Sequence, residues 1–163
     1  MPIYKRGYND NINSRRVTCL NDLFKIAEEL DVNVDFFCFS KLEAMSFMDE
    51  SGNCYIAIDP AKITSAADER TKLGHELGHC ATGSFYRQSA CFDVKGRFEN
   101  RANKWAIRRL IPKDQLDAAV ANGHTEIYDL AEYFGVTESF MRMATSWYQS
   151  GNIRAEKFIL RAE

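Results

Sequence analysis

The order of the expected elements predicts an α+β fold. Three short apolar runs between residues 31 and 59 are typical of strands, and the segments after residue 65 show helical periodicity and cap residues. Strands grouped together after a single helix, and a run of helices that follows them, favour the α+β class. A length of 163 residues, with 45% hydrophobic and 27% charged residues, is ordinary for one soluble globular domain with its own core.

The N-terminal part is expected to hold one helix and a small group of strands. Residues 1–17 show no clear pattern and are expected to form an irregular arm. Thr18 is the predicted N-cap of a helix that continues to about Leu30, because apolar residues recur there at helical spacing. The expected strands are 31–39, 44–48 and 54–59. A loop that contains Gly52 joins the last two, which predicts a hairpin.

The helices after these strands begin and end at recognisable residues. Ser65 and Asp68 resemble a capping box, so we expect a helix from there to about Thr82 that stops at Gly83. A loop is expected over residues 84–96. Four more helices are each followed by a proline or a glycine: 97–111, 113–122, 126–134 and 138–149.

The pattern H-E-x-x-H, formed by His75, Glu76 and His79, lies within the first of these helices. Histidines four residues apart lie one turn apart on the same face, so both imidazoles can bind one metal ion. Glu76 projects beside that face, where its carboxylate can reach a metal-bound water. This arrangement suits a zinc peptidase, which needs protein ligands, a general base and an open position for water. Two surface histidines or a structural zinc site would give the same pattern.

Two glycines, Gly74 and Gly78, lie inside the same predicted helix. Each costs roughly 1 kcal/mol of helix stability relative to alanine. Two such positions about one turn apart indicate that a backbone or a substrate comes too close for a Cβ atom. We therefore expect a close approach to this part of the helix.

A catalytic zinc usually takes three protein ligands, so a third donor is expected elsewhere in the chain. His124 is the one remaining histidine, but it follows Gly123 at a helix boundary, where a surface or cap position is expected. Glu99 is the better candidate because it lies early in an amphipathic helix, twenty residues after His79. Its carboxylate, aimed across at the first helix, would complete a His₂Glu site. Asn103, one turn further on, is a candidate to orient the ligands.

These residues resemble the ImmA/IrrE metallopeptidases over roughly residues 18–148. In that family H-E-x-x-H is followed by E-x-x-A-N-x-(aromatic)-A and by a proline that closes the second helix. Here the second motif runs from Glu99 to Ala106, and the proline is Pro112. The resemblance implies these site residues: the metal ligands His75, His79 and Glu99, and the catalytic acid/base Glu76.

The same resemblance implies a fold and a function. The fold is a gluzincin-like α+β core, residues 1–112, in which a small antiparallel sheet packs on the zincin-type motif helix, followed by a helical appendage, residues 113–163. Family members are intracellular proteases of bacteria and phages that typically cleave a helix-turn-helix repressor. The chain is therefore expected to be a metal-dependent, site-specific endopeptidase with such a repressor as its protein substrate. Zn²⁺ is the expected metal, although another divalent metal would also fit.

Further roles are assigned to residues near the two motifs. Tyr86 is the first candidate for the oxyanion partner, although a core tyrosine fits the sequence equally well. The strand at 54–59 could align a substrate peptide by backbone pairing, or be an ordinary sheet strand. Cys80 and Cys91 could offer thiolates to the metal, but we expect them to be small buried hydrophobic residues.

The C-terminal part resembles a helix-turn-helix over residues 127–140, because Gly135 ends one helix and Thr137 caps the next. Residues 114–141 contain six acidic residues and no lysine or arginine; the first cation after them is Arg142. DNA binding requires cations against phosphate, so we expect no direct DNA binding. The segment is expected to pack on the core or to hold a protein partner.

The helix that carries Glu99 also has a basic strip, defined as Arg97, Arg101, Lys104 and Arg108. A solvated helix face accounts for it. A docking surface for an acidic partner or substrate segment is the alternative.

The remaining features concern the compartment. The five cysteines are odd in number and form no C-x-x-C pair, which favours a reduced cytoplasmic setting. No apolar h-region follows Met1 and no stretch approaches a membrane span, so neither a signal peptide nor a membrane partner is expected. The net charge of −2 gives no overall attraction to nucleic acid.

Two other functions stay open at this point. The chain could be a regulatory binding module, such as a toxin–antitoxin or prophage partner, that sequesters a protein without cleaving it. It could also be a DNA-binding regulator with a structural metal site. The acidic C-terminal helices argue against the second.

Overall fold

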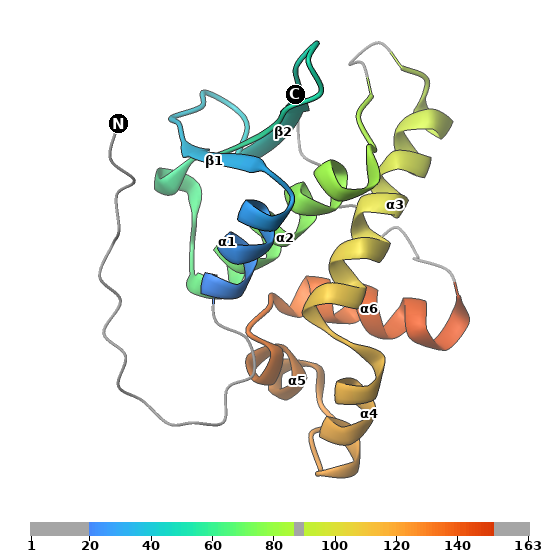
Figure 1. The fold of residues 1–163 in the computed structure, drawn as a ribbon. Coiled ribbons are helices and arrows are strands. Elements are labelled where there is room, and N and C mark those ends of the chain that lie inside the picture. The colour runs from blue at the N-terminus through green and yellow to red at the C-terminus, as the bar shows by residue number, and fades with distance from the viewer. Residues whose placement is uncertain (1–19, 87–89, 152–163) are drawn as a thin grey trace.

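A computed structural model of the chain describes residues 20–86 and 90–151, and Figure 1 shows the arrangement of their helices and strands. One helix precedes the three strands and helices dominate from residue 66 onward, so the predicted α+β class is confirmed. The predicted arm 1–17, the cap residue Thr18 and the segment 152–163 lie outside the described residues.

The sheet has three strands, β1 (Val32–Phe36), β2 (Ala44–Met48) and β3 (Cys54–Ile58), in the order β1-β3-β2. The predicted hairpin of β2 and β3 is confirmed, since these strands pair antiparallel. The expectation of a wholly antiparallel sheet is wrong, because β1 pairs parallel with β3. β1 and β2 run in opposite directions, and β3 lies between them. A strand between two such strands must run parallel to one of them, and here that strand is β1.

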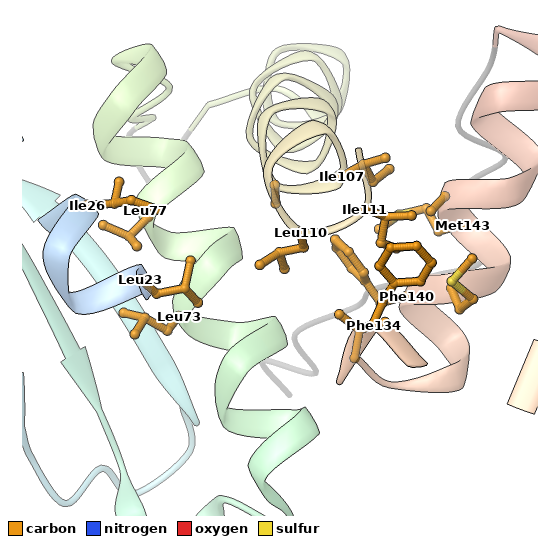
Figure 2. Close-up of a cluster of buried hydrophobic side chains, with 14 of the residues drawn as sticks. Leu23, Ile26, Leu73, Leu77, Ile107, Leu110, Ile111, Phe134, Phe140 and Met143 are labelled. Carbon is orange, nitrogen blue, oxygen red and sulfur yellow. The ribbon is translucent and has the colours of Figure 1, made fainter. Parts of the chain in front are cut away.

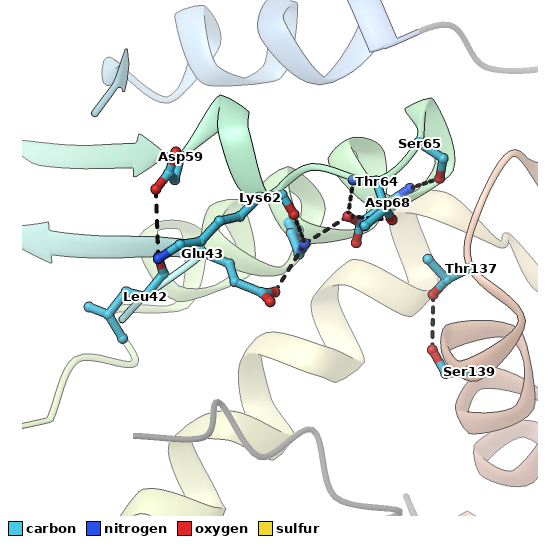
Figure 3. Close-up of polar contacts among 10 residues, drawn as sticks. Leu42, Glu43, Asp59, Lys62, Thr64, Ser65, Asp68, Thr137 and Ser139 are labelled. Atoms are coloured by element: carbon cyan, nitrogen blue, oxygen red, sulfur yellow. Dashed lines mark hydrogen bonds and ion pairs between the residues drawn. The ribbon is translucent and has the colours of Figure 1, made fainter. Parts of the chain in front are cut away.

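The connection 37–43 is held by two residues that follow β3. Asp59 Oδ2 accepts a hydrogen bond from the backbone N–H of Phe39 at 2.9 Å. Lys62 Nζ donates to the carbonyl oxygens of Phe39 and Leu42, each at 2.8 Å. Figure 3 shows Lys62 between Asp59 and Leu42. These bonds fix where the chain leaves β1 and where it enters β2.

The helix that carries the H-E-x-x-H motif is α2 (Ala66–Thr82). Ser65 Oγ accepts a hydrogen bond from the N–H of Asp68 at 3.1 Å, and Asp68 Oδ2 accepts one from the N–H of Thr64 at 2.9 Å (Figure 3). Gly83 ends the helix in the left-handed conformation, with φ 61°. Both predicted ends of the helix are confirmed.

The second long helix, α3 (Phe92–Leu110), begins five residues before the predicted start at Arg97. The prediction treated Gly96 as part of a loop. A Cβ atom at Gly96 would have no neighbour within 4 Å, and Asp93 lies in the first turn, where a negative charge favours the helix. The helix therefore continues through the glycine.

The close approach expected at the two glycines of α2 is confirmed. A Cβ atom at Gly78 would lie 2.4 Å from the carbonyl oxygen of Ala102 in α3. A Cβ atom at Gly74 would lie 2.7 Å from the side chain of Leu110. Glycine is required at Gly78 because the neighbour is a backbone atom, which has little freedom to move. Helices α2 and α3 thus pack closely where the motif residues lie.

The remaining helices share one hydrophobic cluster with these two. They are α1 (Leu20–Glu29), α4 (Lys113–Ala121), α5 (Ile127–Phe134) and α6 (Glu138–Ser150), close to their predicted bounds. Figure 2 shows the cluster, with side chains from α1 and α2 at one end and from α5 and α6 at the other: Leu23, Ile26, Leu73, Leu77, Ile107, Leu110, Ile111, Phe134, Phe140 and Met143.

Helices α5 and α6 form the helix–turn–helix connection that the sequence predicts. Gly135 has φ 61° and ends α5, and Thr137 Oγ1 accepts a hydrogen bond from the N–H of Phe140 at the start of α6. The N–H of Thr137 donates to Thr71 Oγ1 of α2 at 3.1 Å. The C-terminal helices therefore pack directly on the motif helix. The division into units 1–112 and 113–163 stays a prediction.

None of the helices in the described ranges, 20–86 and 90–151, combines the length and the apolar character needed to cross a membrane.

Candidate metal centre

Three side chains from α2 and α3 converge at the point where the helices approach most closely. His75 Nε2 and His79 Nε2 lie 3.1 Å apart. Glu99 reaches both of them, with Oε2 at 3.2 Å from His75 Nε2 and Oε1 at 3.4 Å from His79 Nε2. The structure therefore brings together the three residues predicted as ligands.

These distances fit a metal ion. In a tetrahedral zinc site with bonds of 2.0–2.1 Å, neighbouring ligand atoms are separated by roughly 3.3 Å. The two Nε2 atoms are 3.1 Å apart, and each has a Glu99 oxygen at 3.2–3.4 Å, Oε2 for His75 and Oε1 for His79, so the separations are close to this value. Within the described part of the chain, this is the group of His, Cys, Asp and Glu side chains that could hold a metal ion. Three donors leave a fourth position for water.

Each candidate ligand histidine is oriented by a bond at its other ring nitrogen. His79 Nδ1 lies 2.7 Å from the carbonyl oxygen of Ser84, and His75 Nδ1 lies 2.8 Å from Asn103 Oδ1. An oxygen acceptor requires a proton on Nδ1, which leaves the Nε2 lone pair for a metal. Asn103 thus lies where the sequence predicted, one turn from Glu99 and in contact with the candidate ligand His75.

The carbonyl of Ser84 reaches His79 because of the turn that ends α2. Gly83 reverses the chain, and the N–H of Ser84 donates to the carbonyl oxygen of His79 at 3.0 Å. Ser84 is fully buried, and its hydroxyl contacts that of Thr82. Sequence reasoning missed Ser84. The signal was available in Gly83, because a left-handed C-cap folds the chain back over the last helical turn.

Glu76 lies beside the ligands and is 5% exposed. Its Oε2 accepts a hydrogen bond from Ser46 Oγ of β2 at 2.6 Å. Sequence reasoning also missed Ser46, since a serine in a short apolar strand carries no signal of its partner. The sheet therefore supports the motif helix through a polar contact at the predicted general base.

Charge in the site favours a cation. Burial alone would raise the pKa of Glu99, but its contacts with His75 and His79 in their protonated form and the hydrogen bond from Tyr86 hold that pKa well below its usual range. Burial opposes protonation of His75, yet the nearby carboxylates and Asn103 raise its pKa above the usual value. The ionised Glu99 therefore attracts positive charge to the two ring nitrogens, either a proton or a metal ion.

A family model described as the IrrE N-terminal-like domain, Peptidase_M78, matches residues 27–146. The chain belongs to this family. The match includes both helices of the site and confirms the resemblance seen in the two sequence motifs. A comparison with curated proteins found no match. The Peptidase_M78 family indicates a metallopeptidase-type domain, and the His75, His79 and Glu99 cluster is the place where it could bind a metal ion.

Tyr86 lies at the edge of this Peptidase_M78 site. Its hydroxyl donates a hydrogen bond to Glu99 Oε1 at 2.6 Å. Its ring stacks on Phe98, with centroids 6.2 Å apart, and lies edge-on to His79 at 6.4 Å. Burial and the Glu99 carboxylate raise the pKa of Tyr86, so the hydroxyl keeps its proton and remains a donor. Its predicted role as oxyanion partner stays a prediction.

The other candidate ligands lie apart from the cluster. His124 Nδ1 lies 2.8 Å from Asp129 Oδ2 in the C-terminal part of the domain, in line with the surface or cap position expected for it. Cys80 is half-buried, and burial together with Cys54 raises the pKa of its thiol, which opposes a thiolate. The expectation that Cys91 is buried is wrong. It is exposed because it is the residue at the N-cap of α3, whose start the sequence placed later.

The strand expected to align a substrate is not available for pairing. β3 is the central strand of the described sheet, and its two edges pair with β1 and β2. Among residues 20–86 and 90–151, the outer edges of this Peptidase_M78 sheet therefore belong to β1 and β2. β2 is the edge strand that contacts the site, through Ser46 and Glu76.

The basic strip on α3 is partly engaged within the domain. The Arg101 guanidinium lies 5.6 Å from the ring centroid of Phe98, and that of Arg108 lies 5.2 Å from the ring centroid of Trp147. Both arginines and Arg97 are nevertheless exposed. The strip remains accessible along the helix that carries Glu99.

Proposed function

We propose that this Peptidase_M78 domain is a metal-dependent endopeptidase with Zn²⁺ as its metal. The observation that carries the proposal is the triangle of His75, His79 and Glu99 donors with Glu76 beside it. The spacing fits one divalent cation, and the neighbouring carboxylate supplies the general base that peptide hydrolysis needs.

The residues divide the chemistry among them. Zinc bound here would polarise the scissile carbonyl and lower the pKa of a bound water. Glu76 then takes a proton from the attacking water and passes it to the leaving amine. Asn103 and Ser84 keep the imidazoles in the required tautomer. Tyr86, already a donor at Glu99, is the candidate to stabilise the oxyanion.

The peptide substrate is proposed to pair with the outer edge of β2, which no other described strand occupies, rather than with β3. An extended peptide that adds to a sheet edge gains backbone hydrogen bonds. β2 also carries exposed Phe47 and Met48, which are 45% and 43% exposed and could contact apolar side chains of the peptide. The basic strip on α3 is the proposed contact for acidic residues of the substrate.

The substrate class is proposed from the family resemblance. A helix-turn-helix repressor in the cytoplasm is the expected protein substrate, and its cleavage would release the genes that it represses. Direct DNA binding by this chain is not expected, because Arg142, the one lysine or arginine of α5 and α6, lies 3.4 Å from Glu138 of the same helix. Binding of the repressor without cleavage would instead support the sequestration function.

The test compares the zinc-loaded protein with Glu76→Gln on a helix-turn-helix repressor encoded beside its gene. Glutamine keeps the shape of the side chain but cannot accept the water proton, so cleavage should fall by about 10²–10⁴-fold while zinc content stays the same. Cleavage is read by gel and by mass spectrometry of the fragments. Equal cleavage by the two proteins would exclude Glu76 as the base, and binding without cleavage by either would replace the proposal with sequestration.

A further inference from the structure

Ser46 is a polar residue at a position of β2 whose neighbours are buried and apolar. It lies in the middle of β2, opposite Ile56 of β3, on the same strand face as Ala44. Ile56 is 1% exposed and Ala44 is 3% exposed, so the sheet beside Ser46 is apolar and faces the core, and Ser46 itself is half-buried. A hydroxyl in such surroundings is costly unless it finds a partner.

The partner of Ser46 is the predicted general base. Ser46 Oγ donates to Glu76 Oε2 at 2.6 Å, a short hydrogen bond of the charge-assisted kind. Glu76 is 5% exposed, and a buried carboxylate must be fixed by donors if it is to keep one orientation. Because the bond occupies Oε2, the other oxygen, Oε1, is the proposed proton acceptor.

We propose that Ser46 is a positioning residue for Glu76: its hydroxyl, delivered from the edge strand β2, holds the carboxylate with Oε1 turned to the reacting proton. This inference rests on the proposed function, since it presupposes a proton for Glu76 to accept. The side-chain hydrogen bond of Ser46 goes to Glu76, and Ser46 is not one of the three residues of the candidate metal cluster, so the proposed role acts through Glu76.

Substitutions at Ser46 can separate the effect of the hydroxyl group from the effect of side-chain packing. Threonine and valine have nearly the same shape and both favour strands, but only threonine keeps the hydroxyl. Ser46→Thr and Ser46→Val therefore impose the same steric change on β2. Ser46→Ala, which adds no atoms, is the second variant without a hydroxyl and covers the case in which valine prevents folding. Ser51→Ala, at an exposed serine of the same hairpin, is the matched control.

The probe is acetohydroxamic acid, titrated into the Co²⁺-loaded proteins and followed by the visible absorption of the metal. A hydroxamic acid gives up its O–H proton when it binds a metal, and a correctly placed carboxylate accepts that proton. Wild type, Ser46→Thr and Ser51→Ala should bind the probe with similar affinity. Ser46→Val and Ser46→Ala should lose roughly tenfold or more, the effect of one charge-assisted hydrogen bond, while Co²⁺ content stays the same.

The outcomes separate this inference from the proposed function. Equal probe affinity for Ser46→Thr and Ser46→Val, with alanine also unchanged, would overturn the positioning role of Ser46. Wild-type probe affinity in Glu76→Gln would overturn both the role of Glu76 and that of Ser46. A hydroxyl-dependent loss of probe affinity, in a protein that cleaves no repressor, would support Ser46 as a positioning residue and reject cleavage of a repressor.

Discussion

At the scale of single residues, the site depends on the candidate ligands and equally on the oxygen atoms that orient the two histidines. His75 and His79 each use Nδ1 for an oxygen of the protein and present Nε2 to the cluster. One of these oxygens belongs to Asn103, which is buried in α3, and the other to the backbone of Ser84. A backbone acceptor cannot be removed by mutation, so the contribution of these bonds is best measured at Asn103.

Replacement of Asn103 by alanine should weaken metal binding. Loss of a bond that orients a ligand typically lowers metal affinity by about 10–100-fold, because the ring and its tautomer are no longer fixed. The affinity for Zn²⁺ is measured by competition with a chromophoric chelator. Asn100→Ala, at an exposed asparagine of the same helix, should leave affinity unchanged. Equal affinities for the two variants would show that the bond to His75 has no part in metal binding.

At the scale of secondary-structure elements, the site depends on how closely α2 and α3 approach and on how α2 begins. The close approach places Glu99 within reach of both histidines, and Gly78 permits it. The start of α2 is fixed by Asp68, which binds Thr64 and lies 2.7 Å from Lys72 Nζ. Both features can be tested without touching a site residue.

Gly78→Ala should disrupt the packing of α2 on α3, because its Cβ atom would overlap a backbone carbonyl. Such overpacking typically costs about 1–3 kcal/mol of unfolding free energy, and the displaced Glu99 should weaken zinc binding. Gly96→Ala is the matched control, since its Cβ atom lies in open space within α3. That control should stabilise the protein by about 0.5–1 kcal/mol. Chemical denaturation measures both, and a harmless Gly78→Ala would contradict the close approach.

Asp68 should make the stability of α2 depend on pH. Burial would raise the pKa of Asp68, but hydrogen bonds from Lys72 and Thr64 outweigh it and lower that pKa below the usual value. A lowered native pKa means that the stabilisation is present above the unfolded value of about 4 and is lost as pH falls through the native pKa. Asp68→Asn should therefore be destabilised at pH 7 and approach the wild-type stability at pH 2. A difference that is constant with pH would contradict this account.

At the scale of the whole molecule, the sequence predicted what depends on local signals and missed what depends on contacts between distant segments. The caps Ser65 and Gly83, the hairpin and the pair α5–α6 each depend on a few neighbouring residues, and they are confirmed. The parallel pairing of β1 depends on which strand becomes its neighbour in the sheet, and sequence periodicity does not indicate the order of the strands.

The same division applies to the site. The spacing of His75 and His79 follows from helix geometry, and Glu99 could be found from its place in an amphipathic helix. Ser46 comes from a strand thirty residues before Glu76, so only the folded chain shows the contact. The start of α3 was missed because a helical Gly96 is indistinguishable in sequence from a glycine that ends a loop.

The central claim is that His75, His79 and Glu99 form one metal site, and elemental analysis of purified variants tests it most directly. Wild type and His124→Ala should each hold one equivalent of zinc, because His124 is bound to Asp129 away from the cluster. His75→Ala and Glu99→Ala should lose most of theirs, since two donors are too few for a stable tetrahedral site. Full zinc occupancy in Glu99→Ala, or none in the wild type, would contradict the account.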